Sequence, residues 1–286
     1  MSVEIKNISK SFGKTQALKD VTLTFEDGMI YGLLGRNGAG KSTLLNIITN
    51  RIFASSGEVL IDGENAEEND NALSKVYIMS DAMLYPKDFK IKELFKWSKE
   101  FYKDFDITLA EKYAEKFGLD TNKRVKSLST GFTSIYKLVI ALSVNTPYLF
   151  LDEPVLGLDA NNRELFYSLL IEKYAEEPFT IVISTHLIEE ISSFIEHAII
   201  IDNGEIIMNK SRDELLAMGY AVSGTIGDVN EYIVGKEVIG EDNLGGLKTA
   251  YIFGTPDYNV PESIEITKLD LQKLFVKLTN AKEENR

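Results

Sequence analysis

A short glycine-rich stretch with one lysine and two adjacent hydroxyl side chains is the part of the sequence best equipped for chemistry. It fits the pattern G-x-x-x-x-G-K-[ST] with the residues Gly35, Arg36, Asn37, Gly38, Ala39, Gly40, Lys41 and Ser42, and Thr43 follows directly. Glycines allow successive backbone N–H groups to turn toward one anion, because they carry no Cβ. In this pattern the Lys41 ammonium reaches the β- and γ-phosphates, and the Ser42 hydroxyl ligates Mg²⁺. The stretch therefore predicts a binding site for a nucleoside triphosphate.

The elements on either side place this stretch as the pattern requires. Met29 to Leu34 is a short apolar run that predicts a buried strand, and Thr43 to Thr49 predicts the opening of a helix. The N-terminus of that helix adds its partial positive charge to the anion site. The alternative is a glycine-rich turn that binds nothing, and it leaves the Lys41-Ser42 pair unexplained.

Two adjacent carboxylates follow a second buried strand. Tyr148 to Asp152 is apolar until its last residue, and Glu153 and Pro154 come next. Asp152 is placed to hold Mg²⁺, directly or through water, as an acidic residue after a hydrophobic strand does in phosphate-loop enzymes. Glu153 is the candidate residue that positions and polarises an attacking water. A plain surface turn is the alternative, and the nearby phosphate loop argues against it.

A histidine follows the next buried strand. Phe179 to Ser184 is apolar and leads to Thr185-His186. Strands buried on both faces are typical of a parallel sheet, whose ligands gather at the carboxyl ends of the strands. We therefore expect His186 on the same edge as the phosphate loop, where it can donate to the γ-phosphate. A purely structural histidine is the alternative.

The composition excludes several classes of protein. The 286 residues, 44% hydrophobic and 26% charged, describe an ordinary globular chain of one large domain and a small one, or of two medium ones. The absence of cysteine excludes disulfides and thiolate metal sites, and the net charge of −13 disfavours binding to nucleic acid. The sequence has neither a signal-peptide layout nor a membrane-length apolar run, so we expect a cytoplasmic chain unless a partner holds it at a membrane.

The first part of the chain is rich in strands. We expect strands at Val3 to Ile8, Val21 to Phe25, Gly57 to Gly63 and Val76 to Met79, with a loop at Glu64 to Asn71. These favour an antiparallel β layer beside the nucleotide fold.

A helical insert follows, from Lys90 to about Phe117. Apolar residues from Ile91 to Tyr102 fall on one helix face, and Thr108 with Glu111 predicts the capped start of a second helix. Trp97 lies off the apolar stripe, so some apolar surface is left for a partner helix. Leu187 to Phe194 predicts a later helix.

The order of these motifs resembles that of the ATP-binding-cassette (ABC) ATPases. Leu128-Ser129-Thr130-Gly131-Phe132 stands at the position of the family signature, and Gly157-Leu158-Asp159 follows the carboxylate strand. The resemblance covers roughly the first three quarters of the chain. It implies an α/β fold of the P-loop NTPase class and the ABC type, with a mostly parallel core sheet, an antiparallel β layer and a helical subdomain.

The resemblance also implies roles that the residues alone do not assign. Phe12 would stack on the adenine of ATP, and Asp159 would communicate across a head-to-tail pair of cassettes. Ser129 and Gly131 would close over the ATP bound to the phosphate loop of the other cassette. The implied cofactors are ATP and Mg²⁺, and the implied partners are a transmembrane permease and a second cassette, identical or different.

Two departures from the family pattern affect this expectation. The signature is usually Leu-Ser-Gly-Gly-Gln, whereas Thr130 here adds a Cβ and Phe132 removes an amide. Closure would be weaker, or a different cassette would supply the competent signature. The strand Val76 to Met79 leads to Ser80-Asp81 instead of the family glutamine, and Asp81 is the candidate substitute as a metal contact.

The tail forms a separate expected unit. We expect an ABC ATPase domain at 1–216, with its helical subdomain at about 84–145, and a small C-terminal α/β accessory domain at 217–286. Ala221 to Thr225 and Lys248 to Phe253 predict strands, and the last helix carries Leu271, Leu274, Phe275 and Leu278 on one face. Such an appendix resembles that of ABC-2-type exporter ATPases. A dimer-stabilising or folding role is an equal alternative to a regulatory one.

The sequence therefore indicates the ATP-hydrolysing subunit of an ABC transporter, held by a permease at the inner face of the cell membrane and most similar to exporters. The aromatic helical insert would receive a short helix of the permease. Two alternatives remain. One is a soluble ABC protein of translation or DNA repair, although these usually carry two cassettes, a coiled coil or zinc modules. The other is a regulatory nucleotide-binding module with little hydrolysis, which the altered signature keeps open.

Overall fold

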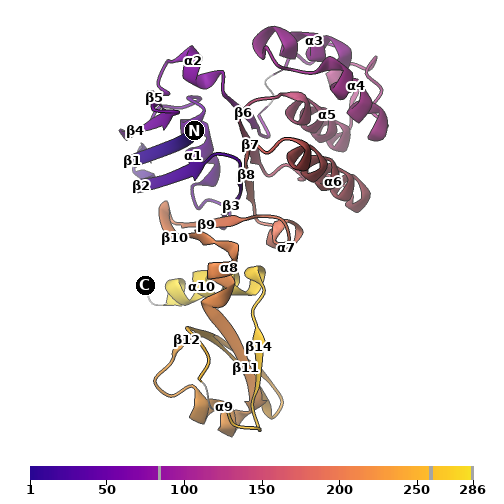
Figure 1. The fold of residues 1–286 in the computed structure, drawn as a ribbon. Helices are drawn as coiled ribbons and strands as arrows, with labels where there is room; N and C mark the ends of the chain where they lie inside the picture. The colour runs from indigo at the N-terminus through magenta and orange to yellow at the C-terminus, as the bar shows by residue number, and fades with distance from the viewer. Residues whose placement is uncertain (83–84, 258–259, 285–286) are drawn as a thin grey trace.

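The computed structural model describes residues 1–82, 85–257 and 260–284. Its elements form two lobes side by side, with a smaller unit below them that contains the C-terminus (Figure 1). Within these described residues, no helix combines the length and apolar character needed to cross a lipid bilayer.

A six-stranded sheet lies at the centre of the two lobes. Its strands, in the order β10-β9-β3-β8-β7-β6, are β10 (Glu205–Ser211), β9 (His197–Asp202), β3 (Ile30–Leu34), β8 (Thr180–Thr185), β7 (Tyr148–Asp152) and β6 (Val76–Met79). All neighbours run parallel except β10, which pairs antiparallel with β9. The prediction of a mostly parallel core sheet is confirmed.

Both faces of this sheet are covered, which explains its continuous apolar strands. Along β7, Leu149 and Leu151 face the core shared with the helices, whereas Tyr148 and Phe150 face the core shared with the β layer. Successive side chains of a strand point to opposite faces, so a strand covered on both sides is apolar throughout. The polar Asp152, which is also buried, is the last residue of this strand, at the edge of the sheet.

The predicted antiparallel β layer is present. Its order is β2-β1-β4-β5, with β1 (Ser2–Phe12), β2 (Thr15–Glu26), β4 (Ser56–Ile61) and β5 (Glu64–Asn65). Helix α1 (Lys41–Ile48) buries Leu44, Leu45 and Ile48 in the same core as this layer. The short α2 (Asp70–Leu73) follows β5.

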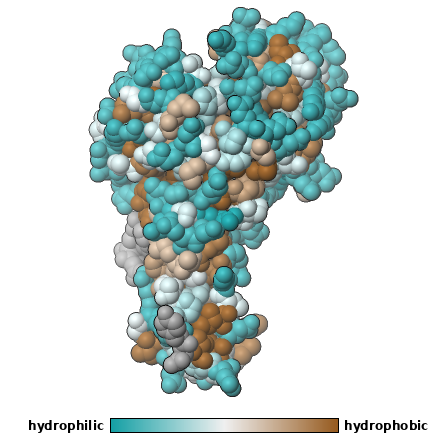
Figure 2. Space-filling view, in the orientation of Figure 1, coloured by the Kyte–Doolittle hydropathy of each residue, from teal (hydrophilic) through white to brown (hydrophobic). Residues whose placement is uncertain are grey.

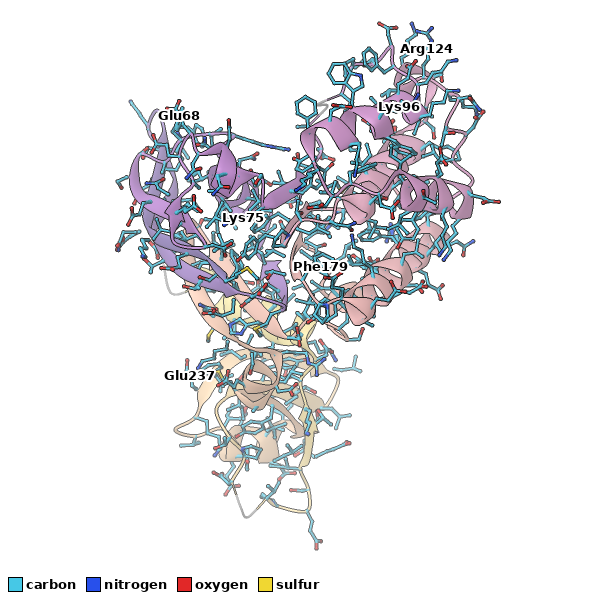
Figure 3. The ribbon with its side chains drawn as sticks, turned by 45° about the horizontal axis from the view of Figure 1, so that its top comes forward. Glu68, Lys75, Lys96, Arg124, Phe179 and Glu237 are labelled. Carbon is cyan, nitrogen blue, oxygen red and sulfur yellow. The ribbon has the colours of Figure 1, made fainter. Side chains whose placement is uncertain are left out.

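The second lobe is helical and lies opposite the β layer (Figure 1). Its elements are α3 (Ile91–Phe101), α4 (Ile107–Lys116), the 3₁₀ turn η1 (Val125–Ser127), α5 (Thr130–Ser143) and α6 (Ala160–Glu176). Figure 3 labels Lys96 and Arg124 in this lobe and Glu68 in the β layer, and it shows the two lobes apart from each other at their outer ends.

The C-terminal residues form a second antiparallel sheet, in the order β12-β13-β11-β14. The elements after β8 that do not belong to the central sheet are α7 (Ile188–Ile191), α8 (Arg212–Ala217), β11 (Gly219–Thr225), α9 (Ile226–Tyr232), β12 (Glu237–Leu244), β13 (Leu247–Phe253), β14 (Glu265–Lys268) and α10 (Leu271–Glu284). The predicted face of α10 is buried at Leu271, Leu274 and Phe275, where the helix contacts α7 and α8. Figure 2 shows hydrophobic residues at the surface near the free end of this unit.

Three local predictions are wrong. Helix α4 is capped by Asp106, whose side chain accepts from Leu109 N, and it begins at Ile107 instead of after Thr108. The expected loop from Glu64 contains β5, because Leu60 and Ile61 of β4 pair with its two residues. The helix expected from Leu187 to Phe194 is limited to the single turn of α7.

Candidate active site

The glycine-rich stretch joins β3 to α1, as predicted, and encloses a pocket of about 180 Å³. The pocket is lined by Ala17, Arg36, Asn37, Gly38, Ala39, Gly40, Lys41, Ser42, Thr43 and Glu153. Gly40 has φ 113°, and a Cβ there would lie 2.8 Å from the Ala17 carbonyl oxygen. Only glycine satisfies both the backbone angle and this close approach. The loop therefore borders the pocket at the N-terminus of a helix, where an anion is favoured.

Lys41 lies almost fully buried beside this pocket, with 5% of its surface exposed. Its Nζ donates to the carbonyl oxygens of Gly35 at 2.6 Å and Arg36 at 3.3 Å, and it lies 3.8 Å from Glu153 Oε1. Burial lowers the pKa of Lys41, and the nearby carboxylates of Glu153 and Asp152 oppose this shift. The Lys41 ammonium is thus held by hydrogen bonds to two backbone carbonyl oxygens, and two nearby carboxylates favour its charged form.

Asp152 ends β7 and is also buried. Its Oδ1 accepts from the Ser184 hydroxyl at 2.9 Å, and the Ser42 hydroxyl donates to the same carboxylate. Burial raises the pKa of Asp152, and the hydrogen bonds from Ser42 and Ser184 oppose this shift. The two residues predicted to hold Mg²⁺, Ser42 and Asp152, are therefore in contact. A hydroxyl and a carboxylate are oxygen donors that suit Mg²⁺, which commonly completes its shell with substrate phosphates and water.

The backbone of Glu153, the residue after Asp152, is left-handed, with φ 48°. Its N–H donates to the Ser184 carbonyl oxygen at 2.8 Å, which fixes this turn at the edge of the sheet. Glu153 Oε2 accepts from the Thr185 hydroxyl at 3.3 Å and lies 2.9 Å from His186 Nδ1. Its Oε1 is buried without a hydrogen-bond partner among the described residues, so an acceptor is left facing Lys41. Non-glycine residues seldom adopt this conformation, and those that do cluster at functional sites.

Phe12 lies at the end of β1, where it pairs with Thr15 across the hairpin. Its ring is half exposed, and Lys10 Nζ lies 5.0 Å from the ring centroid. The same hairpin continues to Ala17, which lines the phosphate pocket. A half-exposed aromatic ring therefore lies in the hairpin whose second strand borders the phosphate site, which suits the predicted contact with adenine.

Ser129 and Gly131 lie at the start of α5 and do not line the phosphate pocket of their own chain. Ser129 caps the helix, since its side chain accepts from Phe132 N at 3.3 Å. Asp159 likewise caps α6 by accepting from Asn162 N at 2.9 Å. The side chains of Ser129, Thr130 and Phe132 are exposed at the protein surface. The structure therefore brings Lys41, Asp152, Glu153 and His186 together, and it places the signature residues apart from them.

Asp81 is not brought to the predicted metal ligands by any contact in the described part of the chain. Its side chain is exposed, and its backbone carbonyl oxygen accepts from Lys137 Nζ at 2.8 Å. Neither Ser42 nor Asp152 is bonded to it within the described residues. The same residues contain no cluster of three or more His, Cys, Asp or Glu side chains that could hold a metal ion alone. The metal role of Asp81 stays a prediction.

Sequence reasoning missed two residues that hold the carboxylates. Ser184 donates to Asp152, and Thr185 donates to Glu153. Both stand at the end of β8, directly before His186. The signal was present, because polar residues ending a buried strand beside the carboxylate strand are expected at the same edge.

Comparisons with known proteins identify the family to which the chain is similar. The family model described as ABC transporter matches residues 18–156. The chain is 30% identical over 279 residues to the ABC transporter ATP-binding protein YtrB of Bacillus subtilis (strain 168), covering 97% of this chain and 93% of that protein. It is 31% identical to the lantibiotic transport ATP-binding protein SrtF of Streptococcus pyogenes, covering 74% and 91%. Relatives of similar identity are named for import, so similarity alone does not fix the direction of transport.

A solved structure of an ATP-binding cassette has a similar fold. The dimeric post-hydrolysis state of the ATP-binding cassette MJ0796, bound to ADP and Pi, matches with a TM-score of 0.66 and 25% identity, covering 73% of this chain and 98% of that chain. Together with the match to YtrB along nearly the whole chain, this likeness settles the family. The chain belongs to the ABC transporter ATP-binding proteins and is an ATPase, the ATP-binding subunit of an ABC transporter.

Proposed function

We propose that this chain drives an ABC-2-type exporter through ATP-dependent pairing of two cassettes. The observation that carries the proposal is the division of the site. Lys41 and Glu153 line one pocket, whereas the exposed Ser129 and the half-buried Gly131 lie outside it on another part of the same chain. In a head-to-tail pair, the signature residues of one cassette would close over ATP bound by the other. Asp159, which caps α6, would communicate across the pair.

The residues within one chain have separate roles in hydrolysis. Lys41 binds the β- and γ-phosphates, and the backbone N–H groups of residues 35–43 surround them. Glu153 positions a water and accepts its proton, because one of its oxygens is bound by His186 and Thr185 and the other is left as an acceptor. His186 fixes the orientation of that carboxylate and is placed to donate to the γ-phosphate. Phe12 stacks on the adenine.

Ser42 and Asp152 would hold Mg²⁺ together with the phosphates of ATP, with Asp81 as a further candidate. When bound, the ion neutralises the charge that develops on the phosphates. This role fits the contact between the Ser42 hydroxyl and the Asp152 carboxylate at the edge of the pocket.

The hydrogen bond from Ser184 to the Asp152 carboxylate allows a test of the metal site. We expect Ser184→Ala to raise the Mg²⁺ concentration needed for half-maximal ATP turnover about tenfold, since a buried hydrogen bond to a carboxylate contributes roughly 1.5 kcal/mol or more. Ser192→Ala is the matched control, because its hydroxyl bonds to a carbonyl oxygen at an exposed turn. An unchanged Mg²⁺ requirement in Ser184→Ala would contradict the role of Asp152, and chelation of Mg²⁺ should abolish turnover in every variant.

The exporter assignment depends on the C-terminal unit and on the helical lobe. Similarity to YtrB runs over 97% of the chain and so includes most of residues 217–286, which we propose to be an accessory domain. The helical lobe carries two large exposed side chains, Trp97 and Phe101, whose ring centroids lie 6.1 Å apart. We propose that this lobe receives a short helix of a transmembrane permease, which would hold the chain at the inner face of the membrane.

The proposal is tested by ATP turnover of the purified chain at increasing protein concentration. We expect the rate per chain to rise with concentration, because a composite site needs two cassettes. Glu153→Gln provides the blank. A rate that exceeds the blank but does not depend on concentration would contradict a composite site made by two copies.

A weakly hydrolysing regulatory module is the second candidate, and Thr130 and Phe132 favour it. The Thr130 side chain is exposed at the start of α5, where an approaching partner backbone would meet its Cβ. A rate that stays at the level of the blank at all concentrations would support this candidate. In that case the double substitution Thr130→Gly and Phe132→Gln, which restores the usual signature, should raise turnover if closure is the step at fault.

A further inference from the structure

Lys10 contacts the ring of Phe12, the residue proposed above to stack on adenine. Its Nζ lies 5.0 Å from the centroid of the Phe12 ring, within the range in which an ammonium is attracted to the face of an aromatic ring. The ring is half exposed, so packing covers only part of it. The Lys10 ammonium is therefore in a position to restrict the orientation of this ring.

The Lys10 ammonium is itself held in place. It donates to the Phe53 carbonyl oxygen at 2.7 Å, in the segment between α1 and β4. Two further hydrogen bonds tie β1 to the same segment. The Ser11 N–H donates to the Ser55 hydroxyl at 3.2 Å, and the Ser55 N–H donates to the Ser9 carbonyl oxygen at 2.8 Å. Lys10 thus connects a fixed backbone position to the ring of Phe12.

The partner of Lys10 and the phosphate pocket lie toward different neighbours of β1. In the β layer, β1 lies between β2 and β4. Ala17 of β2 lines the phosphate pocket, whereas Phe53 precedes β4 and does not line that pocket. Lys10 is therefore tied to the β4 side of β1, and a base whose phosphates lie in the pocket would approach from the β2 side.

We propose that Lys10 is a positioning residue for adenine, which holds the Phe12 ring in the orientation in which the base stacks. Ordering a mobile side chain during binding costs affinity, and a ring that is ordered beforehand avoids that cost. The inference rests on the contact between Phe12 and adenine proposed above. It concerns the base of the nucleotide and not its phosphates, so Lys10 contributes to the affinity for ATP but not for a ligand that has no base.

The test compares Lys10→Gln with Lys10→Arg in the full chain. Glutamine keeps a hydrogen-bond donor and loses the charge, whereas arginine keeps both the charge and the donors. Lys6→Gln is the matched control, since Lys6 is a partly exposed lysine of the same strand whose Nζ pairs with Glu4 at 2.8 Å. Phe12→Leu measures the contribution of the aromatic ring itself.

The probes are ATP and inorganic tripolyphosphate, each with Mg²⁺, and their affinities are measured by displacement of a ribose-labelled fluorescent ATP analogue. We expect Lys10→Gln to weaken ATP binding about threefold, the size of an exposed cation–π contact, and to leave tripolyphosphate binding unchanged. Lys10→Arg and Lys6→Gln should bind both ligands like the wild type. Phe12→Leu should weaken ATP binding about tenfold, because stacking of a base on an aromatic ring is lost.

The double variant tests whether Lys10 acts through the ring. In the Phe12→Leu chain, Lys10→Gln should cause no further loss of ATP affinity, because the contact that it removes is already absent. The same threefold loss in that chain would overturn the proposal, since Lys10 would then act without the ring. Equal weakening of ATP and tripolyphosphate in Lys10→Gln would also overturn it, since Lys10 would then act on the phosphates.

Two further outcomes separate this inference from the proposed adenine contact. Unchanged ATP affinity in Lys10→Gln, together with weaker ATP binding in Phe12→Leu, would overturn the role of Lys10 and leave the adenine contact standing. Unchanged ATP affinity in Phe12→Leu would contradict the adenine contact, and the role of Lys10 with it. A thermal melt of each variant excludes loss of folded protein as the cause, and a lower melting temperature of Lys10→Gln without a base-dependent loss would assign Lys10 to the stability of the hairpin alone.

Discussion

Lys41→Ala is expected to lower the affinity for ATP at least 100-fold and to leave the folded chain as stable as the wild type. Hydrogen bonds to charged groups contribute roughly 1.5–3 kcal/mol each, and Lys41 is expected to make two, to the β- and γ-phosphates. The ammonium also has a cost in the free chain, since burial lowers its pKa. Its removal relieves that desolvation, which offsets the lost bonds to Gly35 and Arg36.

Equilibrium binding of a fluorescent ATP analogue and a thermal melt measure the two parts of this prediction. Lys112→Ala, an exposed position on α4, is the control for the loss of a lysine. A drop in affinity that is matched by a drop in melting temperature would mean that Lys41 mainly supports the loop. Unchanged affinity would contradict its contact with the phosphates.

The phosphate loop could be predicted from the sequence because its chemistry is local. Eight consecutive residues, Gly35 to Ser42, specify the pattern, and the strand and helix on either side are set by short-range periodicity. The same holds for Asp152, which ends the apolar strand β7, and for Glu153, which follows it directly. Parallel strands have their carboxyl ends on one edge, and this rule also placed His186 beside Glu153.

Features that depend on competition between neighbouring residues were harder to predict. Asp106 and Thr108 are both good helix caps two residues apart, and the sequence alone does not rank them. In the structure Asp106 is the cap, and its N–H is also bonded to the Ser143 carbonyl oxygen at the end of α5. Tertiary contact thus decides between two local solutions.

Contacts across the chain lie outside what spacing can show. Arg51 and Ser80 are 29 positions apart, and Lys137 and Asp81 are 56 positions apart. Neither Arg51 nor Lys137 belongs to a motif, and only the hydrogen bonds in the structure show that each contacts the Ser80-Asp81 segment. The functional interest of the Ser80-Asp81 segment was predicted from its departure from the family pattern, but the residues that hold it were not.

Glu153→Gln is expected to lower kcat about 100- to 10,000-fold while ATP binding is kept, because general base catalysis typically contributes a factor of that size. Glutamine has nearly the same shape but cannot accept the proton of the attacking water. The change also removes a negative charge 3.8 Å from Lys41 Nζ and beside the place of the γ-phosphate. ATP affinity should therefore be equal to that of the wild type or higher, since the repulsion between two anions is lost.

This combination, slow turnover with undiminished binding, separates a catalytic role from a structural one. Single-turnover hydrolysis and equilibrium ATP binding measure the two quantities on the same preparation. Glu164→Gln on α6 is the matched control, as an exposed glutamate outside the phosphate pocket. Normal hydrolysis in Glu153→Gln would exclude this carboxylate as the base. Loss of binding together with hydrolysis would instead mean that the left-handed turn at Glu153, bonded to Ser184, Thr185 and His186, serves to hold the pocket open for ATP.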